Sequence, residues 1–542
     1  MASGISWLTR FPAQSNPSKG VVCVAKFAKK KVRPNVVAPV KTTKLRMATY
    51  EGHLGYERDA KSELFLLAVT NMVGENTFYE SKGDRDNRFA GLAQDVTRMD
   101  PEWVRGFVPY LRDTMQMRSA SVVLAAHYVA AGGPNGRSVV DSALQRADEP
   151  AEMLAFWAQE YGRNFPQPIK RGVADAVLRL YNERSALKWD GQGKAWRMGD
   201  VIELVHPKPM FAWQSDLFRW LLDTRHNRAD VTIPESLAMI TARAALEAQP
   251  VENRRGLLKA DYLFERAGMT WESLSGWLQG PMDAEAWETV MPNMGYMALL
   301  RNLRNFEQAG VSDHALDEVA SDLANEAAVK RSRQFPIRFY SAYKQVPSER
   351  FSFPLEQALG HSLKNVPKLK GNTLVMIDVS SSMKNAYSQR GTVNFWETAA
   401  VFGVALAKRQ KRARCFIYNT NVKEVSLDKP IMRTVEAIGG AVTGGTATFQ
   451  MLARCLQQDT FDRVVVLTDE QAHPGHVPTL DIPLYIFNLA GYRTAQQAQG
   501  EKGVYAFGGL TDAGFRMIAA IDEARTREVW PWETKSMSEA TA

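Results

Sequence analysis

The sequence contains few cysteines and no long apolar run. Only three of its 542 residues are cysteines (Cys23, Cys415 and Cys455), and none lies in a C-x-x-C or Cys/His metal pattern. This sparse, odd set argues against a disulfide framework and favours a reducing, cytoplasmic location. No apolar run approaches the roughly 18 residues that a membrane helix needs, and the first residues lack the hydrophobic centre of a secretory signal. We therefore expect an intracellular protein with no membrane partner.

The common catalytic motifs are also missing. The eight histidines form no H-E-x-x-H pattern and no zinc-deaminase pattern, and there is no Walker phosphate loop. No pair of nucleophile and base stands out, since Cys415 lies in a predicted strand. We therefore expect no enzymatic activity and name no catalytic residue.

Positive charge is concentrated at the amino end. The net charge is +8, yet residues 1–47 hold ten Lys and Arg and no acidic residue, so the rest of the chain has 57 Lys and Arg against 59 Asp and Glu. We predict a basic, flexible tail over residues 1–47 that can lie along phosphates by releasing counterions. Three alternatives stay open: a solubilising extension, untranslated sequence if Met47 is the start, and a transit peptide.

The composition is that of a globular protein with two or more domains, because 45% of the residues are apolar and 10% are aromatic. From about residue 62 to residue 366, apolar residues recur at helical spacing between short polar, Pro or Gly breaks. We predict stacked helical hairpins, an α-solenoid, over residues 48–366, although no repeat period is evident. Examples of the predicted helices are residues 63–72, 101–115, 119–131, 149–161, 168–182, 233–247, 294–308 and 335–344.

The pattern changes after the polar link at residues 366–372. Strands and helices then alternate, an order close to the βαβ units of a doubly wound parallel sheet. We place an α/β domain at residues 367–535 and a disordered tail at 536–542. The predicted strands are 373–378, 414–418, 463–467 and 484–488, and the predicted helices are 395–409, one beginning near 448, and 512–523.

Polar side chains follow two of these strands. Residues 378–382 are Asp-Val-Ser-Ser-Ser, residues 443–446 are Thr-Gly-Gly-Thr, and Asp469 follows the strand that begins at residue 463. Open α/β sheets bind ligands at the carboxyl ends of their strands. Hydroxyls with two carboxylates suit a hard divalent cation such as Mg²⁺, which takes six oxygen ligands. The alternative is that the serines cap the next helix and Asp469 begins a turn.

This combination resembles the metal-ion-dependent adhesion site of von Willebrand factor A domains. The resemblance implies a divalent cation, Mg²⁺, whose shell is completed by a carboxylate from a partner. Three of the ligands are hydroxyls, whereas two-metal nuclease chemistry needs clustered carboxylates, so such a site is suited to binding. The implied ligands are Asp378, Ser380, Ser382, Thr446 and Asp469.

The helical part resembles the TROVE domain of Ro-family proteins over about residues 48–535, counting the α/β domain that follows it. The resemblance implies a monomeric ring of HEAT-like repeats closed by the von Willebrand domain. It further implies binding of small structured Y-like RNA, capture of single-stranded ends of misfolded or precursor RNA, and work with a ring-shaped exoribonuclease in RNA quality control. The matching segments are 49–56, 63–79, 117–120, 170–175, 181–184, 299–305 and 332–336.

Basic residues of the helical part are the candidate RNA contacts. Segment 165–220 holds ten Lys, Arg and His against six acids, and RNA recognised by shape and by loose ends needs cations on a rigid frame. The histidine of the animal Trp-Ser-His-Lys-Asp motif is absent, since Trp196-Arg197-Met198 stands there. The aromatic residues Phe211, Trp213, Phe218 and Trp220 could stack bases, but helical spacing is more often that of core residues, so we leave them out of the RNA-binding set and expect core. The candidate RNA-binding residues are Arg118, Lys170, Arg171, Arg184, His206, Arg301 and Arg304.

Two hypotheses follow for the function. The first is an RNA-binding scaffold without chemistry of its own. The second is a protein-interaction module in which the helical repeats and the metal site recruit a partner carboxylate, as in an adhesion-site co-chaperone. Salt weakens RNA binding steeply, whereas chelation removes metal-bridged binding, so the two hypotheses predict different responses.

Overall fold

The structure is a computed structural model, and contacts divide the chain into residues 1–37 and residues 38–542. All of its described residues lie in the second unit. They are residues 42–48, 54–70, 82–191, 193–227, 231–346, 348–386, 392–469, 480–490, 503–510, 513–527 and 529–533.

The chain begins, within the described residues, with an antiparallel hairpin of β1 (Thr42–Ala48) and β2 (Leu54–Arg58). Residues 42–47 of the predicted basic tail therefore lie in a strand. Basic and apolar residues alternate over residues 44–47, which is the period of a strand, and residues 46, 47 and 48 pair with residues 56, 55 and 54 of β2. The rest of the predicted tail, and the predicted tail at 536–542, lie outside the described residues.

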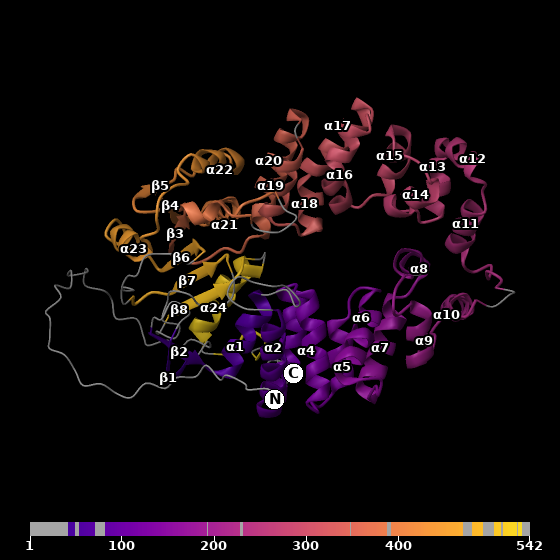
Figure 1. The fold of residues 1–542 in the computed structure, drawn as a ribbon, viewed down its shortest axis with the longest axis horizontal. Helices are drawn as coiled ribbons and strands as arrows, with labels where there is room; N and C mark the ends of the chain where they lie inside the picture. The colour runs from indigo at the N-terminus through magenta and orange to yellow at the C-terminus, as the bar shows by residue number, and fades with distance from the viewer. Residues whose placement is uncertain are drawn as a thin grey trace, which may run out of the picture. The chain divides into compact units, whose positions relative to one another are not determined.

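Helices follow one another in chain order up to residue 365, and each packs mainly on its near neighbours in sequence (Figure 1). This succession is the predicted α-solenoid. The α-helices of this part are α1 (Ala60–Thr70), α2 (Lys82–Met99), α3 (Pro101–Pro109), α4 (Arg118–Ala130), α5 (Gly136–Ala143), α6 (Glu149–Tyr161), α7 (Gln167–Leu180), α8 (Glu183–Trp189), α9 (Met198–Val205), α10 (Ala212–Arg225), α11 (Ala238–Glu247), α12 (Val251–Arg254), α13 (Asp261–Arg266), α14 (Trp271–Leu278), α15 (Ala284–Val290), α16 (Tyr296–Gln308), α17 (Asp313–Ala324), α18 (Glu326–Ser332), α19 (Pro336–Gln345) and α20 (Ser352–Ser362). Shorter turns, one π and four 3-10, are η1 (Tyr110–Thr114), η2 (Arg255–Lys259), η3 (Met291–Asn293), η4 (Glu349–Phe351) and η5 (Leu363–Asn365).

Capping residues and small residues explain where the helices begin and how closely they pack. Asp100 accepts a hydrogen bond from the backbone N–H of Trp103, and Pro101 occupies the first turn of α3, where its missing N–H is not needed. Gly172 lets α7 approach α5, because a Cβ there would lie 2.6 Å from the Arg137 carbonyl oxygen. The hairpin packing therefore depends on single residues as well as on the apolar pattern.

A six-stranded sheet follows, in the order β5-β4-β3-β6-β7-β8, and all neighbours are parallel except β5 and β4. Residues 374 and 376 of β3 face one buried layer, and residues 375 and 377 face the other. Both faces are therefore covered, as in doubly wound α/β folds. The strands are β3 (Asn372–Asp378), β4 (Arg412–Tyr418), β5 (Val422–Glu424), β6 (Arg463–Thr468), β7 (Leu484–Asn488) and β8 (Val504–Gly508), and the helices are η6 (Ser381–Lys384), α21 (Phe395–Arg409), α22 (Ile431–Gly439), α23 (Thr448–Leu456) and α24 (Ala513–Arg527).

The sheet domain contacts both ends of the helical series. At the carboxyl end, Glu397 of α21 is buried and accepts hydrogen bonds from Tyr340 and Lys344 of α19, both at 2.9 Å. At the amino end, α1 contacts β8 and α24, and the side chains of Trp530 and Trp532 lie against Phe65. The helical series is thus joined to the sheet domain at both of its ends.

Most predicted elements are present, within a few residues of their expected bounds. Helix 149–161, helix 395–409 and strand 484–488 match exactly in range. Helix 233–247 begins five residues later, at Ala238, and strand 414–418 begins earlier, at Arg412. Helix α22 and strands β5 and β8 were not predicted. Among the described residues, no helix is long and apolar enough to cross a membrane.

His127 of α4 gives the helical part a pH-dependent stability. Its side chain is 2% exposed and packs on Phe89 and Phe156, and burial lowers its pKa to about 4. Below the ordinary histidine pKa of about 6.5, the unfolded chain binds a proton that the folded chain rejects. We expect stability to fall as the pH drops from about 6.5 towards 4, by about 3 kcal/mol in all.

The measurement is the melting temperature across this pH range for the wild type and His127→Phe. The variant should show a smaller loss of stability at low pH, because it has no proton to gain on unfolding. His314→Phe is the control, since the side chain of His314 is 86% exposed. A pH profile of His127→Phe as steep as that of the wild type would contradict the assignment.

Candidate metal centre and RNA-contacting residues

The two carboxylates of the predicted metal site lie at the carboxyl edge of the sheet, on neighbouring strands. Strand β3 pairs in parallel with β6, with Ile377 opposite Leu467, so Asp378 and Asp469 leave the sheet at the same edge. Both side chains are fully buried. The pairing explains how residues 91 positions apart in sequence come to one place.

The serines follow directly on the loop after β3. The Ser380 backbone N–H donates to Asp378 Oδ1 at 2.8 Å, which holds the loop against its own carboxylate. The hydroxyl oxygens of Ser380 and Ser382 lie 3.2 Å apart. Ser380 is buried and Ser382 is half-buried. The alternative that these serines only cap a helix is not what the contacts show, because neither η6 nor α21 has a side-chain cap from them.

The Thr-Gly-Gly-Thr loop lies alongside the serine loop. The Thr443 N–H donates to the Val379 carbonyl at 2.9 Å, and the Ser381 N–H donates to the Gly444 carbonyl at 3.0 Å. Gly444 has a φ of +79°, a conformation that glycine adopts without strain. Thr446 is 2% exposed. These backbone bonds bring the loop that carries Thr446 against the loop that carries Ser380 and Ser382.

Asn419, which the sequence analysis missed, holds the second loop in place. Its side-chain amide donates to the Thr443 carbonyl at 2.8 Å, and its backbone carbonyl accepts from the Ala447 N–H at 3.1 Å. It follows β4, so it too lies at the carboxyl edge of the sheet. The signal in the sequence that could have identified this residue was an Asn directly after a buried strand. Asn419 contacts residues on both sides of Thr446 and so positions Thr446.

The electrostatics of this edge favour a cation. Burial raises the pKa of Asp378 to about 7, hydrogen bonds from Thr468 and Ser380 oppose the rise, and the neighbouring Asp469 adds to it. The Thr468 hydroxyl donates to Asp378 Oδ2 at 2.7 Å. Two buried carboxylates repel each other, and a divalent ion between them would remove that repulsion.

The donor set fits a hard cation. Two carboxylates and three hydroxyls supply only oxygen, as Mg²⁺ requires, and they leave positions for water or an outside ligand. Among the described residues, no group of three or more His, Cys, Asp or Glu offers an alternative metal site. If a cation binds, Asp378, Ser380, Ser382, Thr446 and Asp469 are the residues that would hold it.

Arg118, the first predicted RNA contact, is engaged within the protein. Its guanidinium pairs with Asp148 and Glu149, both at 2.9 Å, and with Glu152. Burial lowers the pKa of Arg118, and the three carboxylates outweigh this effect and raise it. Glu149 is fully buried and also accepts from Arg112 at 2.8 Å. Arg118 therefore joins α4 to α6, and a contact with RNA stays a prediction.

Four other predicted RNA contacts lie on or beside α7, α8 and α9. Lys170 is half-buried and Arg171 is exposed, both in the first turns of α7. Arg184 is exposed on α8, and His206 is exposed at the end of α9, in a left-handed conformation with φ 47°. No ion pair is found for these four residues in the part of the chain that the structure describes.

A cluster of cations that the sequence analysis did not single out surrounds Trp189 at the end of α8. The distances to the ring centroid of Trp189 are 4.7 Å from Arg146 Cζ, 5.0 Å from Lys188 Nζ and 5.4 Å from Lys194 Nζ. Lys188 follows Arg184 by one helical turn, and like charges at that spacing are destabilising. Arg146 also pairs with Asp148 at 2.8 Å, so Lys188 and Lys194 are the members of this cluster with no ion pair among the described residues.

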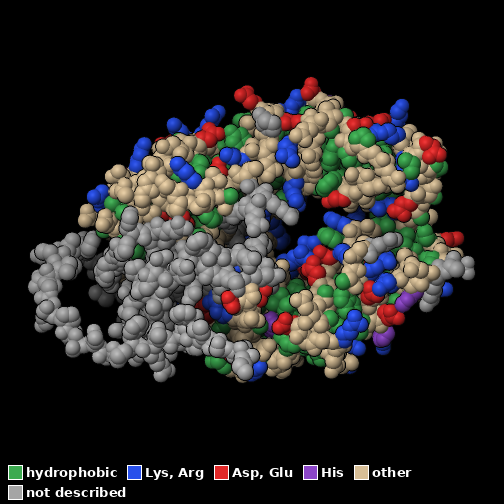
Figure 2. All heavy atoms as spheres, viewed as in Figure 1, with side chains coloured by type: hydrophobic (Ala, Val, Ile, Leu, Met, Phe, Trp, Pro, Cys, Tyr) green, Lys and Arg blue, Asp and Glu red, His purple; other side chains and the backbone are tan. Residues whose placement is uncertain are grey.

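Acidic and basic side chains alternate over the face shown in Figure 2, and no wholly basic face appears there. Several arginines are neutralised by neighbours: Arg137 by Asp175 and Arg179 by Asp141, both at 2.6 Å. If this part of the chain binds an anion, the cations that have no acidic partner are the ones available to contact it. Lys170, Arg171, Arg184 and Lys188 are of this kind among the described residues.

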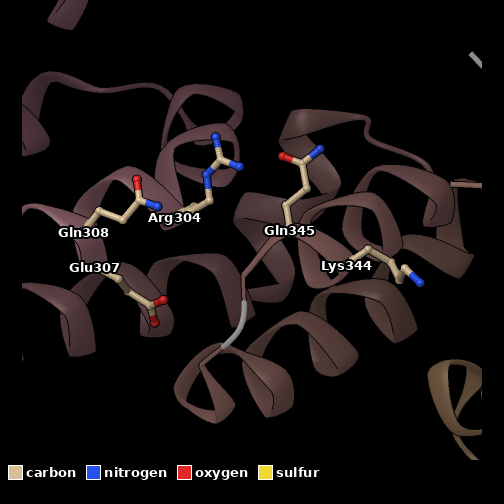
Figure 3. Close-up of a pocket in the computed structure, with 5 residues that line it drawn as sticks. All are labelled: Arg304, Glu307, Gln308, Lys344 and Gln345. Carbon is tan, nitrogen blue, oxygen red and sulfur yellow. The ribbon is translucent and has the colours of Figure 1, made fainter. Parts of the chain in front are cut away.

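Arg301 and Arg304 are both exposed on α16, at the spacing of one helical turn. Arg304 lines an open cavity of about 380 Å³ between α16 and α19, together with Glu307, Gln308, Lys344 and Gln345. In Figure 3, Arg304 and Gln345 extend from these two helices into the same opening. The lining is polar and mixed in charge, and a role in RNA binding stays a prediction.

Comparisons with known proteins identify part of the chain and its fold. Residues 256–399 match the family model of the TROVE domain, a stretch that begins in the helical series and ends in α21. The telomerase protein component 1 of Rattus norvegicus is 42% identical over 62 residues, 11% of this chain and 2% of that protein. The same protein of Mus musculus is 38% identical over 65 residues, 12% of this chain and 2% of the relative. The chain therefore matches a very small part of these relatives.

A solved structure shows the fold. The RO (RSR) protein of Deinococcus radiodurans has a TM-score of 0.63 to this chain and covers 80% of it, while 93% of that protein is matched. The sequence identity is 18%, so this likeness concerns architecture. It confirms the predicted α-solenoid followed by a von Willebrand factor A-like domain. Residues 256–399 are thus similar to the TROVE domain, and the chain has a fold similar to that of the Deinococcus radiodurans RO (RSR) protein.

Proposed function

We propose that this protein is a cytoplasmic, monomeric RNA-binding scaffold. Its helical part binds small structured, Y-like RNA and the single-stranded ends of misfolded or immature RNA. It presents these substrates to an exoribonuclease and performs no chemistry of its own. The observation that supports the proposal is the set of cations on α7 and α8 that have no acidic partner among the described residues, in a chain whose residues 256–399 match the TROVE domain.

The position of these cations on helices supports contacts with an RNA backbone. Lys170 and Arg171 lie on α7, and Lys188 and Arg184 lie on α8, so they are held on rigid helices. Cations fixed by the fold lose little freedom when they bind phosphate. Each phosphate contact releases condensed counterions, so affinity should fall steeply with salt.

The double variant Lys170→Ala/Arg171→Ala tests this interface. We expect its affinity for a structured small RNA to fall about tenfold or more, and its salt dependence to become shallower, because two phosphate contacts are lost. The measurement is fluorescence anisotropy with a labelled RNA hairpin at several salt concentrations. Melting temperatures of the two proteins should agree.

Lys330→Ala/Arg331→Ala is the matched control. It removes the same charge from two adjacent, exposed residues at the end of α18. If this control lowers the affinity as much as the α7 variant, only the net charge matters and the proposed interface is wrong. Unchanged affinity of the α7 variant at matched salt would also refute the site.

The metal centre supports a second candidate function. The loops that carry Asp378, Ser380, Ser382 and Thr446 are held together by backbone hydrogen bonds, which favours a site organised before any ligand arrives. A metal-dependent protein-interaction module would use an open metal position to bind a carboxylate of a partner. Chelation should abolish such binding and leave RNA binding unchanged, which separates the two functions in one experiment.

A further inference from the structure

Two exposed aromatic residues precede and open α10, where the apolar pattern predicted core. Phe218 is buried as expected, but Phe211 is 57% exposed and Trp213 is 38% exposed. Their rings lie parallel, with an angle of 9° between the planes and 6.1 Å between the centroids. The assignment of Phe211 and Trp213 to the core was therefore wrong. Helical spacing fixes a face only within a helix, and Phe211 precedes the first helical residue, Ala212.

The backbone under these rings is held in place. The Met210 N–H donates to Gln214 Oε1 at 2.9 Å, and Gln214 Nε2 donates to the Leu178 carbonyl of α7 at 2.8 Å. Gln214 is 1% exposed, so both ends of its amide are used inside the protein. Pro207 and Pro209 further restrict the chain before the rings. The aromatic pair is thus presented on a rigid support.

The charge around the pair favours an anionic partner. Residues 204–215 contain His206 and Lys208, both exposed, and no Asp or Glu. Exposed, parallel aromatic faces with a nearby cation are the arrangement by which proteins bind single-stranded nucleic acid, because every base has a flat face to stack. A protein partner would more often require a larger apolar patch. Near the pair in sequence, Met210 is an exposed apolar residue, and Lys208 and Ser215 are exposed polar residues.

We infer that Phe211 and Trp213 form a stacking site for the bases of single-stranded RNA, with Lys208 contacting the adjoining phosphate. This inference rests on the proposed RNA-binding function and deepens it. It separates two kinds of contact: cations on α7 and α8 for structured RNA, and the aromatic pair for unpaired bases. The stacking site would hold loose ends without preference for their sequence.

The test compares two labelled RNAs, a short oligoadenylate and a blunt-ended hairpin, by fluorescence anisotropy at one salt concentration. We expect Phe211→Ala/Trp213→Ala to lower the affinity for the oligoadenylate about tenfold or more, and to leave the affinity for the hairpin unchanged. The slope of affinity against salt should not change, because stacking involves no phosphate. Melting temperatures should match the wild type, since both side chains are exposed.

The matched control is Tyr262→Ala/Phe353→Ala, which removes two aromatic residues that are 56% and 70% exposed elsewhere on the helical part. It should bind both RNAs as the wild type does. If the Phe211/Trp213 variant binds the oligoadenylate normally, the stacking site is wrong. The proposed function still stands in that case if the wild type binds the hairpin and the Lys170/Arg171 variant binds it more weakly.

Other results also overturn the inference. An equal loss for both RNAs would indicate a general effect of the substitutions. Self-association of the wild type that disappears in the Phe211/Trp213 variant would show that the pair contacts a second copy of the chain. Failure of the wild type to bind either RNA would overturn the proposed function and the stacking site together.

Discussion

Replacing Trp532 with alanine is expected to lower the free energy of unfolding by about 3–5 kcal/mol, as for other buried tryptophans. The side chain is 6% exposed and lies in an aromatic cluster with residues of α1 and α3. Its ring centre is 4.7 Å from that of Phe107 and 5.0 Å from that of Trp103. It also packs on Trp530 at 5.1 Å. The cluster joins the carboxyl-terminal segment to the first helices.

Loss of Trp532 should therefore have a local effect as well as a global one. We expect residues 529–533 to become sensitive to protease in Trp532→Ala at temperatures where the helical part stays folded. The measurements are thermal melting and limited proteolysis followed by mass spectrometry. If residues 529–533 of the variant stay protected from protease, Trp532 does not hold this segment against the first helices.

Two further variants sharpen the test. Trp532→Phe should cost much less than Trp532→Ala, because the indole Nε1 is buried without an acceptor among the described residues, so no hydrogen bond is lost. Gly106→Ala, in α3, should destabilise the same packing contact between α3 and Trp532. A Cβ at residue 106 would lie 2.7 Å from Trp532 Cδ1, closer than two carbons can approach. A variant Val529→Ala, at an exposed position, is the control.

The second large effect is expected at the metal centre. Saturating Mg²⁺ should raise the melting temperature of the wild type by several degrees, because a ligand present at a hundred times its dissociation constant stabilises the folded state by about 2.7 kcal/mol. The variant Ser380→Ala/Asp469→Ala should show no such rise, since it loses two of the five oxygen ligands. The measurement is thermal melting with and without Mg²⁺, after treatment with a chelator.

Ser426→Ala/Asp428→Ala is the matched control, because it makes the same two changes at an exposed Ser and Asp on the sheet domain. It should keep the full Mg²⁺ effect. Asn419→Ala should weaken the effect without removing a ligand, since it frees the loop that carries Thr446. Equal shifts in the wild type and in Ser380→Ala/Asp469→Ala would exclude the proposed site.

The sequence by itself determined where many of the helices and strands of this protein lie along the chain. The apolar period of 3.6 residues located the helices of the long helical part, and buried runs such as residues 373–378 located strands of the sheet. The polar residues after those runs predicted which side chains meet at the carboxyl edge. The predictions of helices and strands succeeded because period and capping are properties of neighbouring residues, whereas the metal site that the polar residues indicate stays a prediction. The short β5, the hairpin strand β1 and helix α22 escaped because their patterns are brief.

Only the tertiary structure decided which charged and aromatic residues are available to a ligand. Arg118 and Lys170 look alike in sequence, yet Arg118 is held by three carboxylates from α6 and the turn before it, and Lys170 has no acidic partner among the described residues. Phe211 and Phe218 share one apolar pattern, yet the first is exposed and the second is buried. Whether a charged side chain is ion-paired, and whether an aromatic side chain is exposed, depends on residues that are distant in the chain. A local sequence pattern therefore does not predict either property.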